Sequence, residues 1–411
     1  MKRLSAAIAV FGLVLVLSAC GSAGAATRPS LSSRSTAAST DSPSAEPSVS
    51  VWPSATVVPT TTSSPAPASS GSTNDPGYMP ALASIQMVTA RLGWAAGSHN
   101  IYATSDGSHW ASQYQSTNDY AGVDFISTTT GWVVGLHELL GTVDGGHTWH
   151  QLGEAAAPIR SVHFINASQG WGISGGLDVQ AFHGRLVPDS AGTLVTTNDG
   201  GHSWSNMNSP VDAQTVCFSD AGHGWLGTTA GTVYASSDGG RSWTRSVQMP
   251  GEQPGLPGRT LIECAAPSAL WAMYAPGGAA AGSSPYVVYA TANGVDWRAV
   301  MSGLIQTTPP TPQGSGSYPG SFSVIDPSDA VFVGDTAAAD RAEVVVASNG
   351  GATLRRSTGV EATETFDAAF LTTSTGWVLT RSGSGNYMIE ATFDGGAHWS
   401  PQLSVTEQSP G

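Results

Sequence analysis

The chain has 411 residues, with 15 basic and 29 acidic side chains, so its formal net charge is −14 at pH 7. Proteins that bind nucleic acid neutralise phosphates with Lys and Arg, so this composition argues against nucleic acid as a partner. An acidic surface mainly favours solubility.

The first residues predict an export signal. Lys2 and Arg3 precede an apolar run from Ala6 to Leu17, which at about 12 residues is shorter than the roughly 20 that span a bilayer. The run ends in Leu17-Ser18-Ala19-Cys20, which resembles the lipobox of bacterial lipoproteins. The resemblance implies that residues 1–19 are removed and that Cys20 carries a lipid; an ordinary secretory signal is the alternative. We therefore expect an exported protein, held on the outer face of the bacterial cell membrane by this lipid alone.

Residues 20–77 are the lipidated cysteine and a linker rich in Ser, Thr, Pro and Ala. The linker has almost no large apolar side chains, so it cannot bury a core and is expected to be disordered. We predict a stalk that separates the folded domain from the membrane.

A phrase of four short strands recurs seven times within residues 78–405. Each copy begins with an alternating strand such as Val162-His163-Phe164, and a second strand follows that is marked by Gly-Trp or a variant of it. A third strand leads through a turn into a fourth, which begins at another tryptophan. Four strands per repeat are typical of a propeller blade. We predict an all-β fold, a seven-bladed β-propeller of four-stranded blades, with a tail at residues 406–411.

The turn between the third and fourth strands follows the pattern S/T-x-D-x-G-x-x-W in four copies and a degraded form of it in the others. Its carboxylate can accept hydrogen bonds from turn amides, its glycine permits positive φ, and its tryptophan buries a large apolar face. We predict structural roles for these positions: Asp106, Asp144, Asp199, Asp238, Asn293, Asn349, Asp394, Trp110, Trp149, Trp204, Trp243, Trp297 and Trp399.

These turns resemble the Asp-boxes of BNR-repeat propellers, the superfamily that includes sialidases and the sortilin ectodomain. The order Gly-Trp, then Asp-Gly-Gly-x-Ser/Thr-Trp, is most similar to the photosystem II assembly-factor family, whose members are non-enzymatic. The resemblance covers about Tyr78 to Val405. It implies a seven-bladed propeller with a binding or assembly role.

Catalytic and metal-binding patterns are weak. The sialidase relatives begin their propeller with Arg-Ile-Pro, which this sequence lacks. His109, His147, His202 and His398 each lie in a different Asp-box turn, so they cannot converge on one ion. We assign no catalytic residue, no metal ligand and no cofactor. A glycoside hydrolase acting on envelope or extracellular glycans, and a structural spacer of the envelope, are the two alternative functions.

The long connections all belong to one face of the predicted propeller. They join the second strand to the third, or the fourth strand to the first strand of the next repeat, and we call this side the long-loop face. Binding usually resides in such loops. We expect a monomer that recognises protein or glycan there, and the candidate contact residues are Phe182, His183, Arg185, Glu252, Arg259, Tyr274, Tyr286, Tyr318 and Arg341.

Cys217 and Cys264 are the cysteines that remain once Cys20 is lipidated. They lie on the first strands of neighbouring repeats, offset by one position, so they either meet between the repeats or point apart. A bridge needs α-carbons within about 7 Å, which is tight for sheets stacked roughly 10 Å apart. Two buried free thiols are the favoured expectation, and a disulfide is the alternative.

Overall fold

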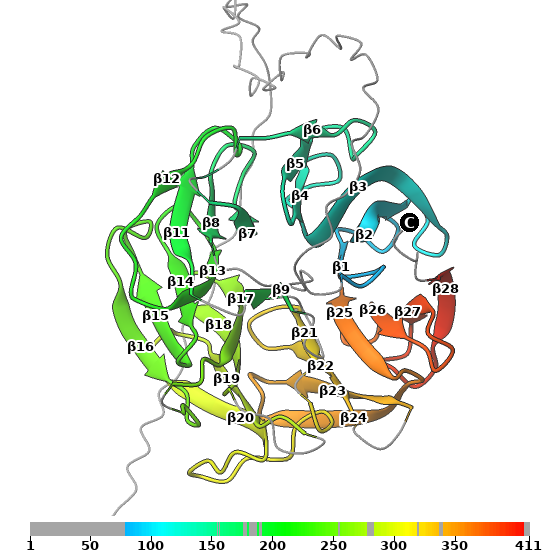
Figure 1. Cartoon of the computed structure of the whole chain (residues 1–411). Coiled ribbons are helices and arrows are strands. Elements are labelled where there is room, and N and C mark those ends of the chain that lie inside the picture. Colours follow the sequence, from blue (N-terminus) through cyan, green and yellow to red (C-terminus); the bar gives the residue numbers. More distant parts are fainter. Residues whose placement is uncertain are drawn as a thin grey trace, which may run out of the picture. The chain divides into compact units, whose positions relative to one another are not determined.

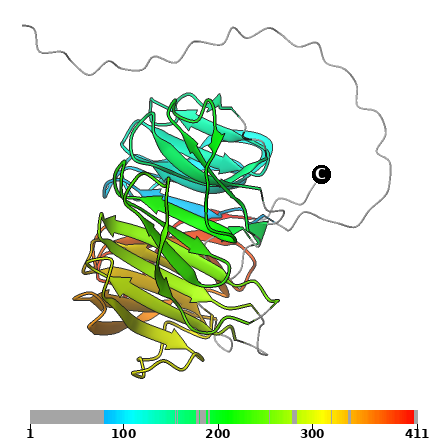
Figure 2. The same cartoon turned by 90° about the vertical axis from the view of Figure 1, so that its left-hand side faces the viewer.

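The computed structural model describes residues 79–406, except 154, 156, 176–178, 181–186, 189–190, 254, 278–282, 319 and 337–339. The signal segment, Cys20 and the stalk lie outside the described residues, so the statements about them stay predictions. The described chain is all β, and its sheets stand around a central axis (Figure 1). Figure 2 shows the same ring from the side, with the sheets packed against one another.

The strands fall into repeats along the chain, and their bounds are as follows. The first sheet contains β1 (Ser84–Met87), β2 (Gly93–Thr104), β3 (Trp110–Phe125), β4 (Gly131–Gly135), β5 (Leu139–Thr142) and β6 (His150–Gln151). The second contains β7 (Ile159–Phe164), β8 (Gly170–Ser174), β11 (Thr193–Thr197) and β12 (Ser205–Asn206), and the ribbon β9 (Val179–Gln180) and β10 (Val187–Pro188) forms a separate pair. The third contains β13 (Ala213–Phe218), β14 (Gly224–Thr228), β15 (Thr232–Ser236) and β16 (Thr244–Gln248), and the fourth β17 (Arg259–Ala266), β18 (Ala269–Ala275), β19 (Tyr286–Thr291) and β20 (Trp297–Gly303). The last two contain β21 (Ser321–Val324), β22 (Ala330–Asp335), β23 (Ala342–Ser348) and β24 (Thr353–Val360), then β25 (Glu364–Phe370), β26 (Gly376–Arg381), β27 (Tyr387–Thr392) and β28 (Ser400–Val405).

The prediction of seven separate four-stranded blades is wrong. Apart from the β9–β10 ribbon, the described strands form six sheets, one of six strands and five of four. The long strand β3 is the cause, because its first half pairs with β2 and its second half with β4. Between Trp110 and Ala121 the sequence has no Gly or Pro to interrupt the strand. The seven sequence repeats therefore form a six-bladed propeller whose first blade carries two of them.

The Gly-Trp dipeptide joins neighbouring repeats through an aromatic stack. The ring of Trp132 lies parallel to that of Phe164 in the next repeat, with centroids 3.5 Å apart. Its Nε1 donates to the carbonyl oxygen of Gly200, in the Asp-box turn of that same repeat, over 2.9 Å. The preceding Gly131 is needed because a Cβ there would lie 2.3 Å from a ring carbon of Phe125. Each dipeptide thus links its own repeat to the next one.

The ring closes through side chains, since no described strand is shared between the first and last sheets. Trp377 Nε1 donates to the carbonyl oxygen of Gly107 over 3.2 Å. Asp367 accepts hydrogen bonds from the Ile85 amide and the Ser84 hydroxyl, each over 3.0 Å. The first and last repeats are therefore held by the same kinds of contact that join the other repeats.

The Asp-box turns are organised around their carboxylates. Asp144 Oδ1 accepts from the Thr148 amide over 2.9 Å and from the Thr142 hydroxyl over 2.9 Å, while Oδ2 accepts from the Thr148 hydroxyl over 2.6 Å. The Gly146 amide donates to Thr142 Oγ1 over 2.8 Å. Burial raises the pKa of Asp144, but the Thr148 hydrogen bonds outweigh it and hold the pKa below its ordinary value. The Asp199 turn repeats these bonds.

We expect Asp144→Ala to lower the free energy of unfolding by about 1 to 3 kcal/mol, because it leaves the Thr148 amide and the Thr142 and Thr148 hydroxyls without their acceptor. Denaturant unfolding of the purified protein measures this. Asp144→Asn is the matched control, since its amide oxygen still accepts at the Oδ1 position and its loss should be smaller. An alanine variant as stable as the wild type would contradict the structural role.

Glu390, in β27, makes stability depend on pH near neutrality. Burial raises its pKa to about 7, and the negative charge of Glu361 adds to the shift. A raised pKa means that the folded state binds the Glu390 proton more tightly than the unfolded chain does. The stability that this proton adds is fully present below the ordinary pKa of 4.5 and is lost as pH rises through about 7. We expect Glu390→Gln to raise the melting temperature at about pH 8 and to leave it unchanged at about pH 4. Exposed Glu252→Gln is the control; an equal effect there would refute the assignment.

Candidate binding site

The structure has a cavity of about 480 Å³ at the axis of the ring. Its walls are the innermost strands of the repeats, β1, the second half of β3, β7, β13, β17, β21 and β25. These strands surround the centre of the ring in Figure 1. The lining includes Asp124, Arg160, His163 and Glu263, the ionisable groups of these strands that face the cavity. Their partners decide what the cavity can do.

Polar side chains on the innermost strands form a series of latches between consecutive repeats. Gln86 Oε1 accepts from the Phe125 amide over 2.6 Å, and Asp124 Oδ2 accepts from the Phe164 amide over 2.7 Å. His163 Nε2 lies 2.7 Å from the Phe218 carbonyl oxygen, to which it donates. The series continues with Glu263 accepting from the Val324 amide and Ser323 from the Phe370 amide, each over 2.9 Å. These side chains therefore hold the repeats together.

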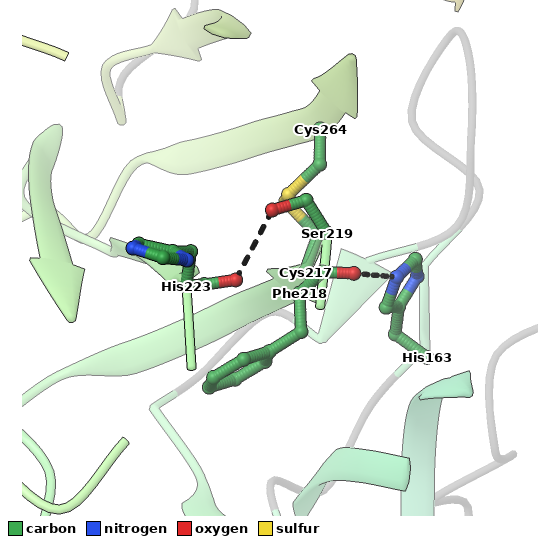
Figure 3. The surroundings of a disulfide bond; sticks show 6 residues. All are labelled: His163, Cys217, Phe218, Ser219, His223 and Cys264. Carbon is green, nitrogen blue, oxygen red and sulfur yellow. Dashed lines mark hydrogen bonds between the residues drawn. A yellow bond between two sulfur atoms is a disulfide. The ribbon is translucent and has the colours of Figure 1, made fainter. Parts of the chain in front are cut away.

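The junction between the repeats of β13 and β17 has a disulfide at the position where Asp124 and Glu263 form latches elsewhere, and Gln214 Oε1 also accepts from the Thr260 amide over 2.8 Å. Cys217 is bonded to Cys264 with a Cα–Cα distance of 6.0 Å (Figure 3). The expectation of two free thiols is overturned, because it used the spacing of stacked sheets. Innermost strands converge on the axis and lie closer together than that. Figure 3 also shows the His163 latch, which bonds to the carbonyl of Phe218, next to Cys217.

A tyrosine and a glutamate, the types that a sialidase pairs, meet near the long-loop face. The Tyr120 hydroxyl donates to Glu138 Oε1 over 2.8 Å, and Asn118 Nδ2 donates to the same oxygen over 2.7 Å. Tyr120 is fully buried, and burial raises its pKa above the ordinary value. A nucleophile must reach its substrate, and the Tyr120 side chain has no exposed surface. We therefore assign this pair a structural role, in which it joins β3 to the connection between β4 and β5.

The candidate contact residues from the sequence differ in how exposed they are. Phe182, His183 and Arg185 lie outside the described residues. Glu252 is exposed, and exposed Arg341 pairs with Glu361 over 3.5 Å.

The remaining candidates are less accessible. Arg259 and Tyr318 are half-buried. Tyr274 and Tyr286 are fully buried, and the Tyr286 hydroxyl donates to the Gly316 carbonyl oxygen over 3.4 Å. Neither of these two tyrosines presents a surface for a ligand.

Sequence reasoning missed the most exposed apolar side chains of the long-loop face. Val211 is 83 % exposed, Leu304 68 % and Leu256 48 %. All three lie in connections between repeats, and two of those connections were recognised as insertions. Mainly aromatic and charged side chains were predicted as contacts, whereas the signal here was an aliphatic residue among Gly, Pro and polar neighbours.

In the part of the chain that the structure describes, no helix is long and apolar enough to cross a membrane. Nor do three or more His, Cys, Asp or Glu side chains in it come together as ligands for a metal ion.

The repeats, the Asp-box turns and the ring of sheets define a BNR-type β-propeller. Residues 102–248, from β2 through β16, match the family described as photosynthesis system II assembly factor YCF48. The likeness to Asp-box propellers and to this assembly-factor family, inferred from the sequence, is thereby confirmed. No curated protein matches the sequence.

Solved structures share the fold at low sequence identity. A structure of YCF48 bound to D1 peptide is 15 % identical with a TM-score of 0.51, over 78 % of this chain and 96 % of that chain. The GH74 xyloglucanase from Xanthomonas campestris is 14 % identical with a TM-score of 0.52, over 79 % of this chain and 53 % of that chain. At these identities the likeness concerns the fold.

Proposed function

We propose that this protein is a non-catalytic, lipid-anchored binding or assembly module on the outer face of the cell membrane, and that it engages a protein partner through its long-loop face. The family match supports an assembly role, and the solved YCF48 structure contains a bound peptide, so a propeller of this fold can bind a protein segment. The lipobox at Cys20 supports the anchoring.

The latches between repeats are the observation that favours a binding function over glycoside hydrolysis. Asp124 and Glu263, the carboxylates that line the cavity, each accept a backbone amide of the next repeat. A glycosidase needs one carboxylic acid that protonates the leaving oxygen and a second carboxylate that attacks or activates water. Carboxylates that hold neighbouring strands are poorly suited to either task. The cavity is therefore better explained as the centre of a scaffold.

Capture of envelope proteins by the full chain tests this function. We expect recovery of a specific protein to fall when the exposed long-loop residues are reversed in charge, as in Glu252→Arg with Arg341→Glu. The matched control reverses exposed residues near the Asp-box turns, Arg241→Glu with Asp296→Arg, and should keep the partner.

Hydrolysis is assayed in parallel with xyloglucan and a sialylated oligosaccharide. Release of reducing sugar that disappears in Asp124→Asn or Glu263→Gln would overturn the proposal, as would capture that depends only on the Asp-box side.

The lipidation of Cys20 can be tested separately from partner binding. Cells that express the wild type and are labelled with a fatty-acid probe should show labelled protein, and cells that express Cys20→Ala should not. The reason is that the diacylglyceryl group attaches to this thiol before the signal is cleaved. Ser18→Thr is the control, since it keeps the cysteine in place. Equal labelling of wild type and Cys20→Ala would refute the anchor.

A further inference from the structure

Three aliphatic side chains project from consecutive connections on the long-loop face. Val211 lies between β12 and β13, Leu256 between β16 and β17, and Leu304 between β20 and β21, and they are 83 %, 48 % and 68 % exposed. We call these three residues the tip surface. The other large apolar side chains exposed in the described chain are Val295 and Phe393, which lie in Asp-box turns on the opposite face.

The connections that carry the tip surface are in contact. The Thr229 amide donates to the Asp212 carbonyl oxygen over 3.0 Å, and the Gly258 amide donates to the Thr229 carbonyl oxygen over 2.7 Å. Gly251 packs so closely on Ile305 that a Cβ on the glycine would lie 3.0 Å from Ile305 Cδ1. The three tips therefore belong to one continuous part of the face.

The backbone of one tip residue, Leu304, is held in place at a cost. Leu304 has a backbone φ of 62°. In the connection between β12 and β13, Asp212, which follows the tip residue Val211, has a φ of 65°. This left-handed region is unfavourable for a bulky side chain and persists only where surrounding contacts impose it. Here Ser302 Oγ donates to the Ile305 carbonyl oxygen over 2.8 Å, and the Gly314 amide donates to the Ser302 carbonyl oxygen over 2.9 Å. A leucine held in this conformation with its side chain in solvent contributes little to the core.

The three connections themselves carry charge of one sign, and the nearby Arg356 of β24, which donates to the Gln313 and Gly314 carbonyl oxygens, is paired with Glu343. Among the described residues of 207–212, 249–258 and 303–318, the charged side chains are Asp212 and Glu252, both exposed, and there is no Lys or Arg. Complementary potentials across an interface favour an oppositely charged partner. The same carboxylates would repel an anionic lipid surface. A ligand that complements both the tip surface and the neighbouring carboxylates is therefore both apolar and basic.

Resting on the proposed function, we propose that the tip surface binds a basic segment of a protein partner that carries aliphatic or aromatic side chains. The apolar side chains of the segment cover Val211, Leu256 and Leu304, and its Lys or Arg residues face Asp212 and Glu252. The preformed conformation at Leu304 reduces the ordering cost of binding.

The test uses the full chain with Cys20→Ser and a labelled peptide of alternating Lys and Leu. Fluorescence anisotropy gives the dissociation constant. The tip variant combines Val211→Thr, Leu256→Asn and Leu304→Asn, because Asn tolerates positive φ. We expect it to weaken binding at least about tenfold. The matched control, Val295→Thr with Phe393→Asn, removes equally exposed apolar groups from the opposite face and should bind within about twofold of the wild type.

Charge is tested separately. Asp212→Asn with Glu252→Gln should weaken the Lys-Leu peptide and flatten its salt dependence, and a Glu-Leu peptide should bind more weakly than the Lys-Leu peptide. A tip variant that binds like the wild type, or a control variant that loses as much, overturns the proposal. So does a Glu-Leu peptide that binds as tightly as the Lys-Leu peptide.

Two other occupants are distinguished in the same set of proteins. Loss of binding to phosphatidylglycerol–phosphatidylethanolamine vesicles in the tip variant, with unchanged peptide affinity, would make the occupant a lipid and overturn the proposal. A wild-type dimer that becomes monomeric in the tip variant would also overturn it. If the tip variant still captures the envelope partner and binds the peptide normally, the tip assignment fails while the proposed function stands. Glycan hydrolysis would instead refute the proposed function.

Discussion

Replacing both Cys217 and Cys264 with Ala is expected to lower the free energy of unfolding by about 4 kcal/mol. The bridge joins residues separated by 47 positions, so its removal restores much of the freedom of a long loop to the unfolded chain. It also replaces a latch, since Cys217 pairs with Trp225 at the register where Asp124 pairs with Trp132. Denaturant unfolding of the double variant and of the oxidised wild type gives the difference.

Two controls separate the covalent link from the loss of an ordinary latch. Ser323→Ala removes a hydrogen-bonded latch at another junction and should cost about 1 kcal/mol. The wild type unfolded in the presence of reductant should match the double alanine variant. Alkylation of the unreduced, denatured chain should leave both cysteines unmodified. Modification of both, together with an unchanged stability of the double variant, would show that the bridge does not form.

The sequence predicts the repeat well because the repeat is physically regular. Gly-Trp recurs because the glycine makes room for a ring and the tryptophan stacks on the next repeat, as at Gly131 and Trp132. The number of blades was not predictable in the same way. It depends on whether the chain breaks between one repeat and the next, and from Gln113 to Asp119 it continues as strand without a break.

The disulfide and the burial of two candidate contact residues escaped prediction for geometric reasons. Alternation placed Cys217 and Cys264 on opposite sides of their strands, but the distance between the strands comes from the closure of the ring. Tyr274 and Tyr286 border long connections, yet they lie inside β18 and β19 and face the core. Neighbouring loops fold over such positions, and their packing cannot be read from a single repeat.

The state of an Asp-box correlates with the hydrogen bonding of the second-strand tryptophan in the preceding repeat, which the sequence alone did not reveal. Where the next repeat keeps its Asp-box aspartate, the tryptophan of the second strand donates a hydrogen bond to a glycine carbonyl oxygen in that turn. Trp171 Nε1, for example, donates to the Gly239 carbonyl oxygen over 3.3 Å. Trp225 and Trp271 precede the turns with Asn293 and Asn349, and in the described structure their buried Nε1 atoms have no hydrogen-bond partner. Where Asn replaces the aspartate, the tryptophan of the preceding repeat therefore lacks this hydrogen bond.

Trp132→Ala is expected to lower the free energy of unfolding by about 3 to 5 kcal/mol. Trp132 is 1 % exposed, so the change opens a large cavity between two repeats. It also removes the stack on Phe164 and leaves the Gly200 carbonyl without its donor. Chemical unfolding followed by tryptophan fluorescence and by far-UV circular dichroism measures the loss and shows whether the ring still unfolds as one unit.

The hydrogen bond can be separated from the packing by comparing two conservative changes. Trp132→Phe keeps an aromatic ring but loses the bond to Gly200, whereas Trp225→Phe loses an Nε1 that has no acceptor. The first change should therefore cost about 1 kcal/mol more than the second. Equal losses would mean that the bond to the Asp-box glycine adds nothing to the junction. A smaller loss at Trp132 would mean that the degraded turns hold their tryptophans more firmly than the intact ones.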